Sequence, residues 1–251
     1  MSWTALILAG SRGAADPVAQ AAGVSHKAFA ELEGRTMLAR VATALSAVPQ
    51  VGRILVSIEP GAPALPAGLE RLDAAPSPAR SVGAALATAA PPVLVTTADH
   101  PLLTPDMVAD FIRGAEAAGA DICAGVATRP VVEAAGNPAR RTYLRFRDAE
   151  VSGCNLFALR TPRAEAAVRF WQRLETERKK PWRMALAIGP LTLASYAAGL
   201  LTMAGAAGAI GRAAGCSAAL VTLDHPDAAH DVDKPADLVF AETRLRARKA
   251  G

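Results

Sequence analysis

The chain has 251 residues, 51% hydrophobic and 20% charged, with a formal net charge of +4. This length suits one α/β domain with a substantial core, which we expect to span residues 1–251. The mildly basic balance fits either an anionic ligand or an ordinary solvated surface. No cluster of basic and aromatic residues indicates nucleic-acid binding.

The cellular compartment is predicted from the cysteines and from the first apolar run. Cys123, Cys154 and Cys216 show no paired spacing, which is typical of core residues in a reducing compartment. The first apolar run has only the length of a strand and lacks a charged leader. We therefore expect a cytoplasmic protein without a signal peptide.

Strand-like and helix-like segments alternate along the chain, which predicts βαβ units and a mainly parallel sheet in the first half. Segments 142–146 and 153–159 are too close for a crossover, so we expect a small antiparallel insertion at about 140–160. Residues 61–79 are rich in proline and alanine and predict an irregular connection. Strands are expected at 4–8, 53–58, 92–97, 121–127, 142–146, 153–159 and 218–223, and helices at 37–47, 79–90, 106–118, 162–177 and 236–248.

The first predicted strand ends at a glycine-bearing loop that is followed by two cationic residues. Backbone N–H groups of such a loop approach an anion closely. Arg12 and Lys27 can neutralise a polyphosphate. The pattern predicts a triphosphate site without the Walker motif, and the residues expected to contact the nucleotide there are Leu8, Ala9, Gly10, Ser11 and Gly13.

Acidic residues follow two later segments. Asp99 comes directly after the apolar strand at 92–97, where it suits either a Mg²⁺ ligand or a cap of the next helix. Near the end of the chain, alternation in an extended segment places Asp231 and Asp233 on one face. Thr104 is expected to cap the helix at 106–118, and Asp237 is expected to be a first-turn acid of the last helix.

Residues 184–211 include no charged side chain. Pro190 and repeated glycines argue against a single transmembrane helix, so we expect two or three short buried helices, with Thr202 capping one. A docking surface for a membrane beside the basic 178–183 cluster, or a site for a bulky apolar acceptor, remains an alternative.

The ordered motifs resemble the nucleotidyltransferase superfamily typified by molybdenum-cofactor guanylyltransferase and the sugar-phosphate nucleotidyltransferases. The chain departs from the pattern at Ser11, which replaces a second glycine, and at Thr36, which replaces a proline. The resemblance implies a Rossmann-like GT-A fold, with a mixed, mostly parallel sheet flanked by helices. The matching positions are Leu8, Ala9, Gly10, Arg12, Lys27, Gly34, Met37 and Leu38.

The resemblance also implies a reaction, the Mg²⁺-dependent transfer of a nucleoside monophosphate from a triphosphate to a phosphorylated or hydroxyl acceptor, with release of pyrophosphate. Arg12 would hold the leaving phosphates, and Lys27 would bridge the α-phosphate and the incoming oxygen. Asp99 would bind Mg²⁺ together with Asp231 or Asp233, between which the sequence does not decide.

The resemblance also implies residues that bind the nucleoside and residues that bind the acceptor. Ser81 lies where the superfamily reads the base and ribose, although an ordinary capped helix start fits equally well. Asn155 matches a residue that faces the acceptor. Arg141 and Arg183 lie in basic clusters that suit an acceptor phosphate or a solvated helix end.

Three other functions share part of this pattern or are tested by it. A nucleotide-sugar glycosyltransferase shares the sheet but usually carries D-x-D after the central strand, whereas Asp99 is followed by His100 and Pro101 here. A non-catalytic nucleotide-binding module would be indicated by loss of Lys27 or Asp99, and both are present. A dinucleotide oxidoreductase is disfavoured because no G-x-G-x-x-G follows the first strand. The nucleotide, the acceptor and the oligomeric state are not specified by these motifs.

Overall fold

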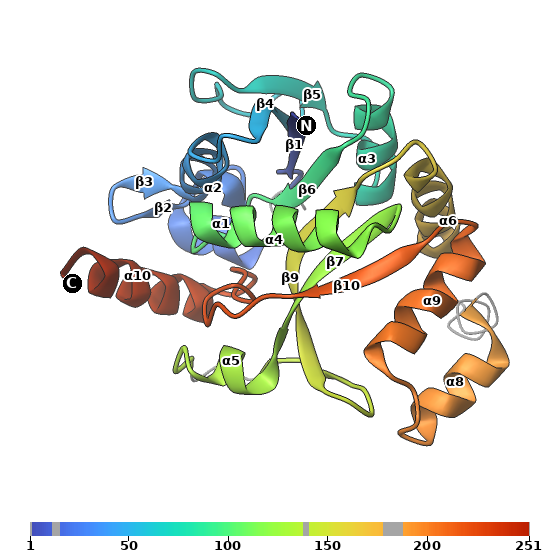
Figure 1. Cartoon of the computed structure of the whole chain (residues 1–251). Helices are drawn as coiled ribbons and strands as arrows, with labels where there is room; N and C mark the ends of the chain where they lie inside the picture. The colour runs from blue at the N-terminus through green and yellow to red at the C-terminus, as the bar shows by residue number, and fades with distance from the viewer. Residues whose placement is uncertain (1, 12–15, 138–140, 178–187, 251) are drawn as a thin grey trace.

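The fold is built on a mixed sheet whose parallel core comes from the first half of the chain (Figure 1). The computed structural model describes residues 2–11, 16–137, 141–177 and 188–250. Strand β1 (Trp3–Leu8) pairs in parallel with β4 (Val51–Ile58) on one side and with β6 (Val93–Thr97) on the other. Strand β5 (Glu70–Asp73) extends the sheet beyond β4. The prediction of an irregular connection at 61–79 is therefore wrong for these four residues.

The second half of the chain completes the sheet with a strand of opposite direction. Strand β9 (Glu150–Leu159) lies antiparallel between β6 and β7 (Ile122–Thr128), and β10 (Ala218–Thr222) pairs in parallel with β7. The short β8 (Leu144–Arg145) pairs only with the first residues of β9. The predicted mixed, mostly parallel sheet is therefore confirmed, and the strand expected at 153–159 is a central member of it.

Helices cover both faces because alternate side chains of β1 point to opposite sides. Ala5 and Ile7 belong to the cluster packed by α2 (Met37–Ser46) and α4 (Pro105–Ala118). Leu6 belongs to the opposite cluster, packed by α3 (Pro78–Leu86) and α6 (Ala164–Glu177). Thr104 caps α4 as predicted, since its hydroxyl accepts from Met107 N. Burial on both faces explains the continuous apolar run of this strand.

A third cluster joins the N-terminal region to the final helix, α10 (Pro235–Ala250). Buried residues of α1 (Pro17–Ala22), the hairpin β2 (Glu31–Leu32)–β3 (Arg35–Thr36) and α10 pack together there. Glu33 and Gly34 have φ values of 49° and 72°, which a two-residue hairpin turn of type I′ requires. The motif glycine is thus a turn residue, and Thr36 caps α2 by accepting from Ala39 N at 3.1 Å.

The short elements of the fold were not predicted from the sequence. They are α1, the 3₁₀ turn η2 (Lys27–Phe29), the β2–β3 hairpin and α5 (Arg129–Glu133). Each is too short to show a hydrophobic period, so local capping and turn bonds define it. In α1, for example, the Asp16 carboxylate accepts from Val18 N and Ala19 N.

The uncharged stretch forms two helices in its described part, α8 (Pro190–Ala197) and α9 (Met203–Ala214). Thr202 caps α9 as predicted, because its hydroxyl accepts from Gly205 N. Several residues of α9 are buried, but none of α8 is, and Leu191 is 82% exposed. The prediction of buried helices is right for α9 and wrong for α8. Within the described ranges, no helix is long and apolar enough to span a membrane.

One buried carboxylate ties three strands together at the edge opposite the glycine loop. Asp121, just before β7, accepts from the amide and the hydroxyl of Ser217, each at 2.8 Å. It also accepts from the Thr161 hydroxyl at 2.6 Å. These bonds, led by the Ser217 amide, lower the pKa of Asp121 to about 2. The carboxylate thereby links the ends of β7, β9 and β10.

We expect Asp121→Asn to lower the free energy of unfolding by about 2 kcal/mol at neutral pH, because hydrogen bonds to charged groups contribute about 1.5–3 kcal/mol. The folded-state pKa of Asp121 lies below its ordinary value of 3.8. Its stabilisation is therefore complete above about pH 4 and is lost as the pH falls toward 2. Denaturant unfolding at several pH values measures the difference between the two proteins.

Asp224→Asn is the matched control, since Asp224 is exposed and lies just beyond β10. A difference between wild type and Asp121→Asn that stays constant from pH 7 to pH 2 would contradict the assignment.

Candidate nucleotide and metal site

The candidate site lies where the parallel strands end. The carboxyl ends of β4, β1 and β6 bring Glu59, Gly10 and Asp99 to one edge of the sheet, in that order. Two backbone bonds continue the pairing past the strands, from Ala9 N to Ser57 O and from Ala98 N to Leu8 O. Ligands of open α/β sheets bind at this edge, so the sheet topology itself selects these loops.

The glycine loop is described through Ser11. Ala9 is buried beside the sheet, whereas Gly10 is exposed. The Ser11 backbone N–H donates to Glu59 Oε1 at 2.8 Å. Arg12 and Gly13 lie outside the described residues. Sequence reasoning missed Glu59, although an acidic residue directly after the second apolar strand was the available signal.

Lys27 joins two predicted acidic residues. Its ammonium lies 2.6 Å from Asp99 Oδ2 and 3.2 Å from Asp233 Oδ1, and it donates to Val232 O at 3.3 Å. Burial by itself lowers the pKa of Lys27, but the two carboxylates outweigh this effect and raise the pKa above its usual value. Lys27 therefore stays protonated at physiological pH.

Asp99 retains unused acceptor capacity. Its Oδ1 atom is buried and has no hydrogen-bond partner among the described residues. The later acidic segment is fixed against it, because Val232 N donates to Asp99 O at 2.8 Å. Asp237 Oδ2 accepts from the amides of Asp233 and Lys234, which fixes the start of α10 and agrees with the predicted first-turn role.

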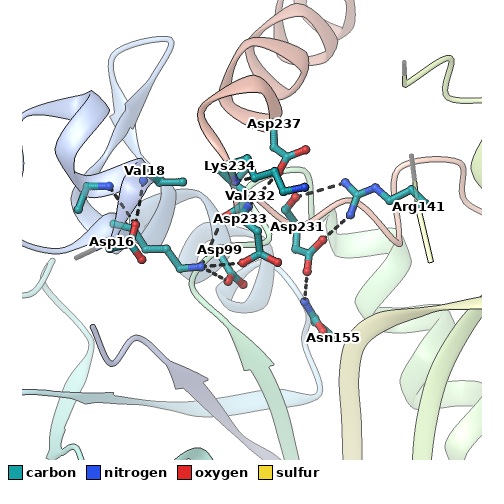
Figure 2. A network of polar contacts seen from close by, with 12 residues as sticks. Asp16, Val18, Asp99, Arg141, Asn155, Asp231, Val232, Asp233, Lys234 and Asp237 are labelled. Carbon is teal, nitrogen blue, oxygen red and sulfur yellow. Dashed lines mark hydrogen bonds and ion pairs between the residues drawn. The ribbon is translucent and has the colours of Figure 1, made fainter. Parts of the chain in front are cut away.

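Asp231 turns away from this pair. Figure 2 shows it facing Arg141 and Asn155, while Asp233 faces Asp99. Arg141 donates to Asp231 Oδ1 at 2.5 Å, and Asn155 Nδ2 donates to Oδ2 at 3.3 Å. Burial raises the pKa of Asp231, but Arg141 and Asn155 outweigh this and hold the pKa below its usual value. The two aspartates thus have different partners, because the backbone between them bonds to Asp99 instead of forming a regular strand.

Asn155 reaches Asp231 from an irregular point in β9. The register between β7 and β9 shifts between Ala124 and Val126, opposite this residue. Asn155 has a φ of 50°, and Glu33 is the other non-glycine residue with a positive φ in the described ranges. Bulges and left-handed non-glycine residues cluster at functional sites, where they aim a side chain.

Two cavities flank Arg141. The first has a volume of about 510 Å³ and is lined by Asn155, Asp231 and Asp233, among others. The second, of about 660 Å³, includes Arg129 and His230 in its lining. Arg141, Thr142 and Lys234 line both cavities.

His230 holds Arg141 in place between the cavities. Its Nδ1 lies 3.0 Å from Arg141 Nη2 and 3.1 Å from Asn137 Nδ2. Both of these groups are donors, so Nδ1 is the acceptor nitrogen of a neutral ring. Burial, followed by the charge of Arg141, lowers the pKa of His230 to about 4. The predicted acceptor residue Arg141 is therefore held rigidly, and Arg183 lies outside the described residues.

Ser81 has a structural environment. Its side chain is buried, and its hydroxyl oxygen accepts from Ala75 N at 3.0 Å. Ser77 caps the same helix by accepting from Arg80 N. Ser81 thus shapes the turn before α3.

Asp99 and Asp233 form a pair of carboxylates with the Lys27 ammonium between them. Over the described part of the chain, no group of three or more His, Cys, Asp or Glu side chains could hold a metal ion. Mg²⁺ is usually bound by one or two carboxylates together with phosphate oxygens and water. The pair Asp99 and Asp233 therefore fits a metal that arrives with a triphosphate.

Known structures share this architecture. A hypothetical transferase from Thermus thermophilus is 28% identical, with a TM-score of 0.82, and the alignment covers 95% of this chain and 100% of the other. The 2-C-methyl-D-erythritol 4-phosphate cytidylyltransferase from the same organism is 19% identical, with a TM-score of 0.56 and 98% of each chain covered. CMP:2-keto-3-deoxy-manno-octonic acid synthetase complexed with CTP is 13% identical, with a TM-score of 0.57, covering 99% of this chain and 100% of the other. The last two similarities concern the fold.

Sequence comparison assigns the family. No match to a curated protein was found. Residues 5–169, which include the glycine loop, Lys27, Asp99 and Asn155, match the model of the MobA-like NTP transferase domain. The chain therefore belongs to the family of MobA-like NTP transferase domains and is a nucleotidyltransferase.

Proposed function

We propose that this protein is a Mg²⁺-dependent enzyme that transfers a nucleoside monophosphate to a small acceptor bearing a phosphate or a hydroxyl. The observation that carries the proposal is the Lys27 ammonium between Asp99 and Asp233, one strand away from the glycine loop. It places a fixed cation and two carboxylates, which are groups able to bind Mg²⁺, at the edge of the sheet where ligands of such folds bind.

The reaction joins an acceptor oxygen to the α-phosphorus of the triphosphate. The bond from that phosphorus to the bridging oxygen breaks, and pyrophosphate leaves with the electron pair. Such a transfer requires positioning and neutralised charge more than covalent help. Lys27 donates to the oxygens around the α-phosphorus as negative charge builds there, and Arg12 is the residue expected to hold the leaving phosphates.

Asp99 and Asp233 would hold Mg²⁺. Asp99 Oδ1 is buried and has no hydrogen-bond partner among the residues that the structure describes, which supports this assignment, since such an acceptor needs a cation or donor. When bound, Mg²⁺ would neutralise part of the triphosphate charge. Lys27 is close to both carboxylates already, so it offsets part of their negative charge before substrate arrives.

The acceptor would enter the 510 Å³ cavity beyond Asp233. Asn155 and Asp231 line it, and Arg141 separates it from the second cavity. We assign Asp231 to the acceptor side because its oxygens are taken by Arg141 and Asn155. A held arginine and a carboxamide can bind phosphate and hydroxyl oxygens.

We expect Lys27→Ala to lower kcat for pyrophosphate release by about 10²–10³, because it removes a charge aimed at the transition state. Lys249→Ala is the control, since Lys249 is an exposed lysine of α10 that pairs with Glu33 in the β2–β3 turn. Pyrophosphate release measures kcat, and circular dichroism checks the fold. Turnover of Lys27→Ala within a few-fold of wild type would exclude the assigned role.

Substitutions of Asp99, Asp233 and Asp231 should differ in their effect on the Mg²⁺ dependence of triphosphate binding. Asp99→Asn and Asp233→Asn should each raise the Mg²⁺ concentration needed for triphosphate binding, because each removes a charged ligand. Asp231→Asn should instead raise the KM for the acceptor and leave the Mg²⁺ requirement unchanged. Calorimetric titration of triphosphate at several Mg²⁺ concentrations tests this, and a Mg²⁺ shift confined to Asp231→Asn would reverse the assignment.

Asn155 allows function and backbone strain to be measured apart. Asn155→Gly and Asn155→Ala both remove the carboxamide, so both should raise the KM for the acceptor by a similar factor. At a φ of 50° alanine is strained and glycine is not, so the alanine variant should be less stable by about 1 kcal/mol. Denaturant unfolding measures the stability difference, and equal stabilities would show that the backbone relaxes.

A further inference from the structure

Glu59 lies at the end of the site farthest from the acceptor cavity. It directly follows β4, the parallel neighbour of β1, and so stands beside the glycine loop. Its Oε1 accepts from Ser11 N at 2.8 Å and would lie 3.5 Å from a Cβ atom added to Gly10. The carboxylate therefore faces the loop that is expected to meet the nucleotide.

The charges around the loop set the direction of a bound triphosphate. A carboxylate repels phosphates, so we expect the phosphates to lie away from Glu59, toward the Lys27 ammonium and the Mg²⁺ that Asp99 and Asp233 would hold. Two consecutive residues reach the two ends of the site. His26 Nε2 lies 3.4 Å from Glu59 Oε2. The next residue, Lys27, contacts Asp99 and Asp233. The uncharged nucleoside is thereby directed to Glu59.

Glu59 has acceptor capacity to spare at that end. Its Oε2 is buried and makes no hydrogen bond within the described part of the chain, and the His26 contact is long. A carboxylate has about four acceptor sites, of which Ser11 N occupies one. Nucleosides present adjacent donors in two places, the 2′- and 3′-hydroxyls of ribose and the N1–H and N2 amine edge of guanine.

We propose that Glu59 binds a pair of adjacent hydrogen-bond donors on the nucleoside and so selects the nucleotide; this rests on the proposed function. In dinucleotide-binding folds, a carboxylate beyond the glycine loop binds ribose in the same way. Ser81, which the resemblance placed at the nucleoside, has its hydroxyl engaged by Ala75 N.

The test is calorimetric binding of the four ribonucleoside triphosphates with Mg²⁺ to the full chain. Glu59→Gln should weaken the tightest of them by about tenfold or more, because it replaces a charged acceptor. Glu165→Gln, an exposed glutamate of α6 that pairs with Arg169, should change nothing. Thermal unfolding confirms that each variant is folded.

Analogues identify the donor pair. The 2′-deoxy and 3′-deoxy forms remove ribose donors, and ITP in place of GTP removes the guanine amine. The analogue that lacks the recognised donor should bind wild type at least tenfold more weakly, yet lose little further in Glu59→Gln.

The outcomes are distinct. Wild type that binds a triphosphate but shows no loss with any analogue overturns the Glu59 assignment, even if Glu59→Gln does not fold. Binding by Glu59→Gln within twofold of wild type overturns it as well. Wild type that binds none of the four triphosphates overturns the proposed function and this inference with it.

Discussion

The contact of Lys27 with two carboxylates is the interaction on which the arrangement of the site depends. Its three members come from residues 27, 99 and 233, which are far apart in the sequence. Such a partly buried charge cluster adds little net stability, because desolvation offsets the attraction. Its role is to specify position, and the backbone bond from Val232 to Asp99 fixes the same segments. Contacts within the chain itself thus position these three side chains.

The order of the strands gives the site its direction. Glu59, Gly10, Asp99 and Asn155 stand on β4, β1, β6 and β9, which are consecutive neighbours in the sheet. Charged groups follow one another along this line, from the Glu59 carboxylate through the Lys27 ammonium between Asp99 and Asp233 to Arg141 beside Asp231. A nucleotide and an acceptor laid across it would meet near Lys27, which is where the proposed transfer requires neutralised charge.

The part of the site proposed to bind the acceptor is built from rigid but irregular segments. The bulge at Asn155, the neutral His230 and the Arg141–Asp231 pair hold one another in a fixed geometry. Backbone strain of this kind persists only where surrounding contacts over-determine the conformation. Arg141 is therefore held in one position between the two cavities that it lines.

The sequence by itself determined most strands of the sheet, its long helices and the identity of the central charged residues. Apolar runs mark β1, β4 and β6 because strands buried on both faces need apolar side chains on both. Lys27 and Asp99 belong to motifs that can be recognised from the order of residues along the chain. The short elements α1, η2, α5 and the β2–β3 hairpin escaped prediction because two to six residues show no period. Only the tertiary structure separated Asp231 from Asp233, because alternation in the sequence places both side chains on the same face. Their partners, Arg141 and Lys27, come from distant segments of the chain. The tertiary structure also showed what Glu59 contacts, because the sequence places an acidic residue directly after an apolar strand, whereas the approach of β4 to the glycine loop is a property of the sheet.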